Sequence, residues 1–213
     1  MLKDENMIMS TLQGAGAIIT DSHLVYTSGL HGSTSVNKYA LYTDSVSVSS
    51  VCSILATAII TAGIDAQVIV GPAMGGITLS QWTAYHLWRK LGSKVLSVFA
   101  EKIFLGDAME LKHGYEKIVK DKRVFIVEDV LTTGGSVKKT IEAVSRACGT
   151  VVGVDLFNRG NITAESLGVP RLMSLVELEL STYNPETCPL CATGVPINTD
   201  VGKGKEFLAS KHS

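Results

Sequence analysis

The sequence lacks the long apolar run that a membrane-spanning helix or a secretion signal needs. Its longest apolar stretch, residues 51–64, is interrupted by three hydroxyl side chains and is shorter than the roughly 20 residues that cross a bilayer. Residues 3–5 are all charged, where a signal peptide would begin its apolar segment. We therefore expect neither secretion nor insertion into a membrane.

Cysteine is scarce, and neither sign of charge is in excess. Four cysteines in 213 residues are too few for a disulfide scaffold, which favours a reducing, cytoplasmic location. The formal net charge is -1, so no overall positive field favours nucleic acid or an anionic membrane. This balance does not exclude an anion site in a single loop. Internal repeats and low-complexity tracts are also absent from the sequence.

The remaining composition favours an α/β domain with a large core. Apolar residues make up 46% of the chain and charged residues 18%, which suits a globular protein of one domain. Short apolar runs predict strands at residues 67–70, 94–99, 123–127, 150–157 and 172–178. Helical periodicity lies between them, at residues 48–62, 84–91 and 137–148. This alternation predicts a central parallel sheet flanked by helices.

Three segments do not fit the alternating pattern. We predict that residues 1–45 form a small N-terminal hood with short strands, before a core that spans residues 46–180. Residues 100–122 are polar and irregular, and loops of that length are commonly functional lids. Residues 181–213 read as a C-terminal tail.

The strongest local signal lies where the strand near residue 127 ends. Two acids, Glu128 and Asp129, come directly after the apolar run and precede a Thr-Thr-Gly-Gly-Ser sequence and a helical pattern. Glycines let the backbone approach a ligand closely, and the amides at a helix start bind anions. The candidate anion-binding residues are Thr132, Thr133, Gly134, Gly135 and Ser136. The acids, at the carboxyl end of a parallel strand, are placed to hold ribose hydroxyls or a metal.

This segment, residues 124–136, resembles the signature of the type I phosphoribosyltransferase family. The resemblance implies that Glu128 and Asp129 bind the ribose hydroxyls of phosphoribosyl pyrophosphate (PRPP), while the loop that follows wraps its 5′-phosphate. It also implies Mg²⁺ bridging the pyrophosphate and the ribose, with no metal-binding side chain assigned. A homodimer is implied too, in which basic groups of the lid serve the neighbouring site.

Two further segments resemble the orotate branch of this family. The turn that contains Ala73, Met74, Gly75 and Gly76 corresponds to the pyrophosphate loop, although a lysine usually stands where Gly75 is. In the lid, Lys102, Lys112 and His113 match the basic residues that would neutralise the departing pyrophosphate. With Asp129, these three are the candidate catalytic residues.

The sequence gives the least information about the residues that bind the acceptor base. The hood around residues 26–39 resembles that of orotate phosphoribosyltransferases, with Lys38 supplying a charge that the family often places elsewhere. Arg159 matches the arginine that meets the orotate carboxylate. Orotate is therefore the expected acceptor. A purine or other-base transferase, and a PRPP-sensing regulator without catalysis, remain as alternatives.

Cys188 and Cys191 form a CxxC pair in the tail. Two thiolates at this spacing can share one zinc ion, but a closed site needs four ligands. A second CxxC is missing, and Cys52 and Cys148 fall on the core faces of predicted helices. A site completed by His212 or by a partner subunit, and a simple proline-containing turn, both remain open, so we assign no metal ligand here.

Overall fold

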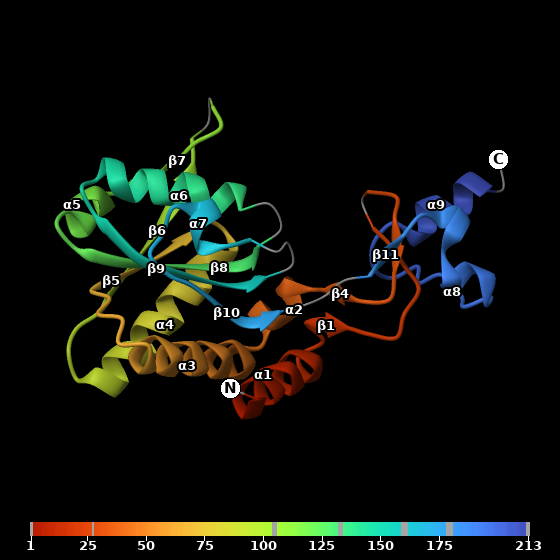
Figure 1. The fold of residues 1–213 in the computed structure, drawn as a ribbon, viewed down its shortest axis with the longest axis horizontal. Helices are drawn as coiled ribbons and strands as arrows, with labels where there is room; N and C mark the ends of the chain where they lie inside the picture. Colours follow the sequence, from red (N-terminus) through yellow and green to blue (C-terminus); the bar gives the residue numbers. More distant parts are fainter. Residues whose placement is uncertain are drawn as a thin grey trace.

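A computed structural model describes residues 2–26, 28–103, 106–131, 134–158, 162–177 and 181–211. Its centre is a six-stranded sheet in the order β10-β9-β8-β5-β6-β7 (Figure 1). These strands are β5 (Val68–Pro72), β6 (Leu96–Lys102), β7 (Met109–Glu110), β8 (Arg123–Leu131), β9 (Thr150–Asn158) and β10 (Leu172–Glu177). All neighbours run parallel except β6 and β7. The predicted α/β fold with a central, mostly parallel sheet is confirmed.

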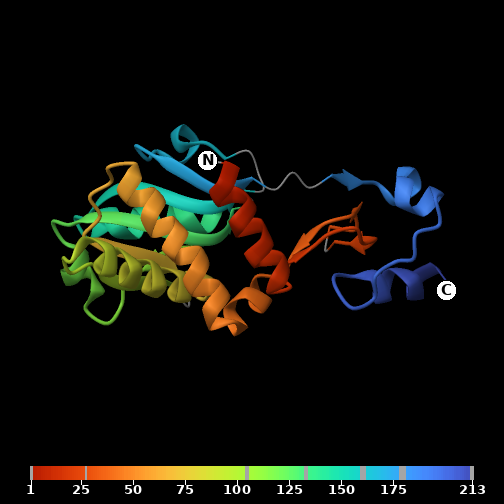
Figure 2. The ribbon, with the colours of Figure 1, turned by 90° about the horizontal axis from the view of Figure 1, so that it is seen from below.

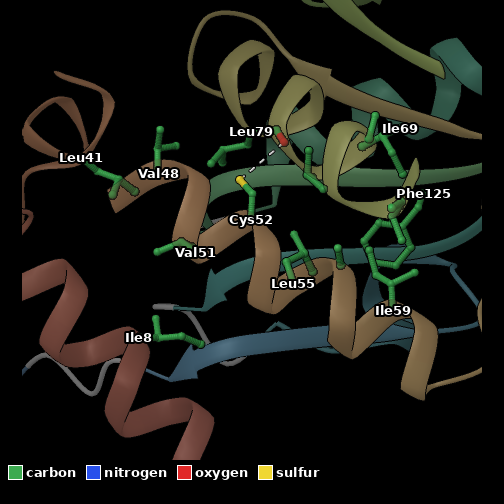
Figure 3. Packing of buried hydrophobic residues seen from close by; sticks show 14 of the residues in the cluster. Ile8, Leu41, Val48, Val51, Cys52, Leu55, Ile59, Ile69, Leu79 and Phe125 are labelled. Carbon is green, nitrogen blue, oxygen red and sulfur yellow. Dashed lines mark hydrogen bonds between the residues drawn. The ribbon is translucent and has the colours of Figure 1, made fainter. Parts of the chain in front are cut away.

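Helices cover both faces of the sheet, and the strands bury alternate residues toward each. On one face lie α1 (Leu2–Gly14), α3 (Ser45–Thr61) and α4 (Gly75–Leu91); on the other lie α5 (Tyr115–Val119), α6 (Gly135–Arg146) and α7 (Ala164–Leu167) (Figures 1 and 2). Ile69 and Phe125 pack against α3 and α4 (Figure 3). Val68 and Val124, one residue earlier in each strand, pack on the opposite face, as strand geometry requires.

The N-terminal helix differs from the sequence expectation, which was of short strands. Ile8 and Leu12 of α1 are buried in the same cluster as the core face of α3. Helix α1 is therefore part of the core packing. A 3.6-residue period is present in residues 2–14, but it is weak because polar residues interrupt the apolar face.

The predicted lid, residues 100–122, contains regular structure in its described part. It includes the end of β6, the short strand β7 and helix α5, with Glu101 opposite Glu110 in an antiparallel hairpin. Residues 104 and 105 lie outside the described residues. The motion expected of a lid stays a prediction.

The hood and the tail meet beyond one end of the main sheet (Figure 1). Strands β2 (Leu24–Val25) and β3 (His31–Gly32) form a three-stranded sheet with β11 (Thr182–Tyr183), and β1 (Ile18–Ile19) pairs with β4 (Ser35–Val36). Helix α2 (Lys38–Thr43) follows β4. The tail adds η1 (Pro185–Thr187), α8 (Pro189–Ala192) and α9 (Gly204–Lys211). We call the part formed by residues 20–36 and 181–211 the hood–tail module. The predicted domain boundaries stay predictions.

Among the described helices, none combines the length and the apolar character needed to cross a membrane.

Candidate functional site

The acidic pair lies in a bulge of strand β8. The register with β9 shifts between Val127 and Val130, so that one extra residue of β8 is accommodated where Glu128 and Asp129 stand. A bulge bends the strand and redirects side chains. Both acids can therefore take part in one site, although adjacent residues of a regular strand point to opposite faces.

Asp129 is held from helix α2. Its side chain is only 6% exposed, and its Oδ2 lies 2.8 Å from Lys38 Nζ and accepts a hydrogen bond from the Tyr42 hydroxyl at 3.0 Å. Lys38 and Tyr42 are four residues apart on α2, so they project from the same face of that helix. Sequence reasoning missed Tyr42, for which this i, i+4 relation to Lys38 was the available signal.

Electrostatics keep one of the two acids neutral in the ligand-free protein. Burial, and then the negative charge of Asp129, raise the pKa of Glu128 from 4.5 to about 8. Burial and the same charge raise the pKa of Tyr42, so its hydroxyl stays a donor. Partial burial lowers the pKa of Lys38, but its hydrogen bond to Asp129 outweighs this and leaves the pKa above its ordinary value. The site thus holds an ammonium–carboxylate pair beside a protonated carboxyl group.

The turn between β5 and α4 approaches this pair closely. A Cβ atom added at Gly75 would overlap Asp129 Oδ2 and crowd the Tyr42 hydroxyl. A Cβ atom added at Gly71 or at Gly76 would overlap the backbone of the other glycine, and the Ala73–Met74 peptide bond is cis. The absence of a lysine at position 75 therefore has a steric reason in this chain: any side chain there must displace Asp129.

A cleft with a volume of about 480 Å³ lies over these elements. It is lined by Val36, Asn37, Lys38, Tyr39, Ala73, Met74, Gly75, Lys102, Glu128, Asp129 and Ser136. The structure thus brings together eight predicted site residues from α2, the β5–α4 turn, β6, β8 and α6. Val36, Asn37 and Tyr39 belong to the hood segment whose sequence resembles that of orotate phosphoribosyltransferases, but only Lys38 of that segment was assigned a role.

Helix α6 presents its N-terminus to the cleft. Its N-cap, Gly134, has a φ of 75°, a left-handed conformation that glycine adopts without strain. Ser136, in the first turn of α6, lines the cleft. Unpaired amides and the positive end of the helix dipole make this position suited to a phosphate group.

Two predicted catalytic residues lie elsewhere. Lys112 Nζ and His113 Nε2 lie 3.5 and 3.6 Å from Glu101 Oε2, and both line a different cleft, which Arg146 also lines. Lys102 is the predicted basic residue of the lid that lines the cleft of Asp129. The roles of Lys112 and His113 stay predictions. Thr132, Thr133 and Arg159 lie outside the described residues.

The raised pKa of Glu128 predicts that this residue makes the stability of the fold depend on pH. A group whose pKa is higher in the folded than in the unfolded state contributes its full stabilisation at pH values below the unfolded-state pKa, here near 4.5. This contribution is lost as the pH rises through the folded-state pKa of about 8. Glu128→Gln removes the titration, and its amide oxygen can still accept from the Asp129 N–H, as Glu128 does at 3.0 Å. The variant should therefore be more stable than the wild type at pH 8.5, by on the order of 3 kcal/mol.

Thermal unfolding of ligand-free protein at pH 5 and pH 8.5 measures this effect. About 3 kcal/mol corresponds to a rise in Tm of roughly 6–12 °C for a chain of this size, with little difference at pH 5. Glu110→Gln, at an exposed position in β7, is the matched control and should give no pH-dependent difference. Equal Tm values for Glu128→Gln and the wild type at both pH values would contradict the assignment.

Comparisons with known proteins agree on one family. Residues 46–163 match the family model of the phosphoribosyl transferase domain, which is more than half of the chain. An orotate phosphoribosyltransferase of Pelotomaculum thermopropionicum is 38% identical over 92% of this chain and 95% of its own length. One from Caldanaerobacter subterraneus is 43% identical over 63% of this chain and 66% of its own length, so that match spans just under two thirds of that relative.

A solved structure is similar as well. The crystal structure of orotate phosphoribosyltransferase from Aeropyrum pernix superimposes with a TM-score of 0.61 at 27% sequence identity. The match covers 79% of this chain and 92% of that one. It extends the similarity from sequence to the arrangement of the strands and helices around the cleft.

Proposed function

Because the chain belongs to the phosphoribosyltransferase family, in its orotate branch, we propose that it transfers the 5-phosphoribosyl group of PRPP to orotate. The bond from ribose C1 to the pyrophosphate oxygen breaks, a bond from C1 to a ring nitrogen of orotate forms, and that nitrogen loses its proton. The products are pyrophosphate and orotidine 5′-monophosphate. The observation that carries this proposal is the convergence of the acidic bulge of β8, the N-terminus of α6 and the Gly75 turn on one cleft.

Each part of PRPP has a complementary surface in this cleft. The 5′-phosphate binds the amides at the start of α6, beside Ser136. The ribose hydroxyls donate to the carboxylate of Asp129 and to the carboxyl group of Glu128. The pyrophosphate lies over the turn at Ala73–Gly75, where small residues expose the backbone, and Lys102 faces it from the end of β6.

Two effects lower the activation barrier of the transfer: positioning of the substrate and stabilisation of the charges that grow in the transition state. The C1–oxygen bond is largely broken in the transition state, so negative charge grows on the pyrophosphate and positive charge on the ribose. Lys102 stabilises the first by its ammonium group, and the buried carboxylate of Asp129 stabilises the second. The α6 amides and the acids fix the two ends of the ribose phosphate, so that C1 faces the base.

Mg²⁺ is the proposed cofactor, bound mainly through the substrate. The carboxylate oxygens of Glu128 and Asp129 are hard ligands of the kind Mg²⁺ prefers. One oxygen of Asp129 is already paired with Lys38, so the protein offers few open positions, and most ligands of a bound ion would come from the substrate and water. When bound, the ion neutralises charge on the pyrophosphate.

Recognition of the base falls to the hood-side wall of the cleft. Lys38 and Tyr39 line that wall, and Tyr39 is 70% exposed, so its ring is available to a planar base. Lys38 is 37% exposed at its side chain and bridges from Asp129 to the cleft. We assign the orotate carboxylate to Lys38, together with Arg159 as the resemblance implies.

A homodimer and a cytoplasmic location complete the proposal. Helix α4 exposes Tyr85, Trp88 and Leu91, by 40, 46 and 49%, and neighbouring exposed apolar side chains mark protein interfaces. Lys112 and His113, which lie away from the cleft of their own chain, would then serve the site of the partner subunit.

The decisive assay follows the ultraviolet absorbance of orotate. Purified protein with PRPP, Mg²⁺ and orotate should deplete orotate, and omission of PRPP or chelation of Mg²⁺ should stop the reaction. Turnover of adenine or another base in place of orotate would exclude orotate as the acceptor. The assignment of the chain as a phosphoribosyltransferase would still hold. Binding of PRPP without turnover of any base would instead identify a PRPP-sensing regulator.

A further inference from the structure

Four potential metal ligands meet in the hood–tail module, two from the hood and two from the tail. His23 precedes β2 and His31 begins β3, while Cys188 caps α8 and Cys191 lies within it. One ligand atom from each residue lies within 4.8 Å of those of the other three. His23, His31 and Cys188 are at most 2% exposed, so three of the four groups are shielded from solvent.

The distances match a tetrahedral site. Cys188 Sγ and Cys191 Sγ lie 3.7 and 3.6 Å from His23 Nε2, and Cys191 Sγ lies 3.4 Å from His31 Nδ1. Zinc bonds of about 2.05 Å to nitrogen and 2.3 Å to sulfur place such ligands about 3.6 Å apart at the corners of a tetrahedron. The two ring nitrogens are 2.9 Å apart and need to separate to about 3.3 Å around an ion.

The orientation of His23 is fixed by a contact outside the cluster. Its Nδ1 lies 2.7 Å from the carbonyl oxygen of Val195. Since a carbonyl only accepts, Nδ1 carries the proton, and Nε2 presents its lone pair to the cluster. Metal-binding histidines are typically oriented by this kind of second hydrogen bond. The backbone of His23 is also tied to the tail, because Asn198 N–H donates to its carbonyl at 2.7 Å.

The hood–tail module has little apolar core of its own. Among residues 181–210, all of them described, Cys188 has the only buried side chain. Neither of the two hydrophobic clusters includes a described residue beyond 175. Small units with so few buried apolar side chains commonly depend on a metal or a disulfide, and Cys188 and Cys191 are thiols in this structure.

We propose that His23, His31, Cys188 and Cys191 bind one structural Zn²⁺ ion. Two nitrogens and two sulfurs in a closed tetrahedral set favour zinc over Mg²⁺ or Ca²⁺, and all four ligands come from one chain. The two histidines of the hood thus supply the two ligands that the thiolate pair of the tail lacks. The ion joins the hood to the tail across 165 positions of sequence between His23 and Cys188.

The site also bears on the cleft, through the chain that leads out of it. β3 continues through β4 into Lys38, and Val36, Asn37 and Lys38 line the cleft. Binding of zinc at His31 therefore fixes the start of the segment that carries one wall of the cleft. The proposal itself rests on the four ligands alone and holds whichever base the cleft accepts.

Metal analysis of the full-length protein tests the proposal. Protein purified without a histidine tag or chelator should contain one zinc per chain by mass spectrometry of the elements. Replacement of zinc by Co²⁺ should give the visible d–d bands of a tetrahedral ion and a thiolate-to-cobalt charge-transfer band. The Cys188→Ser/Cys191→Ser variant should fall below about one tenth of a metal per chain and lose the charge-transfer band.

Matched variants separate the site from general effects. Cys148→Ser removes an exposed cysteine, and His86→Gln a half-buried histidine on α4, so both should keep one zinc. The Co²⁺ spectrum of the wild type needs no variant and decides the case if the serine variant fails to fold. Zinc below one tenth per chain together with an octahedral cobalt spectrum, retention of zinc by the double serine variant, or iron in place of zinc would overturn the proposal.

Discussion

Asp129→Asn should lower kcat/KM for PRPP by about a thousandfold while the protein remains folded. The carboxylate of Asp129 is buried and oriented by Lys38 and Tyr42, so it meets the ribose without reorganisation. Hydrogen bonds to a charged acceptor contribute about 1.5–3 kcal/mol each. Loss of two such bonds in the transition state amounts to about 4 kcal/mol, which is about a thousandfold in rate.

Steady-state kinetics with PRPP varied, combined with circular dichroism, measures this effect. The fold should survive because Lys38, 37% exposed at its side chain, can be solvated once its partner is neutral. Asp65→Asn is the matched control, since Asp65 pairs with Arg123 at the surface and lies outside the cleft. A change of less than threefold in Asp129→Asn would remove Asp129 from the site.

Gly75→Ala should lower kcat/KM by about a hundredfold, although it adds a single methyl group. The new Cβ overlaps Asp129 Oδ2 and lies too close to the Tyr42 hydroxyl, so the carboxylate has to move and its bond with Lys38 is disturbed. Misplacement of a positioned group by about 1 Å can cost this much. Lysine at position 75 should be at least as harmful, although the resemblance noted from the sequence predicts a lysine there.

A double-mutant comparison isolates the cause. In an Asp129→Ala background the overlapping oxygen is gone, so Gly75→Ala should have a much smaller further effect on the residual rate. Gly14→Ala is the control for an added methyl group, because a Cβ there meets no atom within 4 Å. Wild-type activity in Gly75→Ala, or equal losses in both backgrounds, would contradict the steric account.

The sheet was predictable from the sequence because its signals are local. Strand β8 shows an apolar run, two acids and a glycine pair within a short stretch, and its neighbours show similar runs closed by glycine. Apolar alternation and helical periodicity depend only on neighbours in sequence. The placement of Glu128, Asp129 and Ser136 at one cleft follows from the parallel sheet, whose carboxyl ends meet at one edge.

The remaining features depend on contacts between distant residues. The spacing from Lys38 places Tyr42 on the same helix face, but it does not identify Asp129, 87 positions away, as the partner of the Tyr42 hydroxyl. The β8 bulge is defined only by its register with β9. Cys188 and Cys191 were visible as a pair, but the completions left open, by His212 or by a partner subunit, did not include His23 and His31. Pairing of β11 with β3 and the bridge between His23 and Ile197 bring these histidines to the tail.

The steric role of Gly75 was hidden for the same reason. Its sequence context predicts a turn, and the resemblance noted from the sequence predicts a lysine in place of this glycine. The close approach of Asp129 turns that departure into a requirement of this chain, because the acid occupies the space that a side chain would need.

Calorimetric titration of PRPP into the folded protein with Mg²⁺ tests the central claim most directly. The account predicts saturable binding of one PRPP per chain, weakened strongly in Asp129→Asn and unchanged in Asp65→Asn. The absence of binding heat at several temperatures, in protein shown to be folded, would contradict the assignment of the cleft between Asp129 and the start of α6 to this substrate.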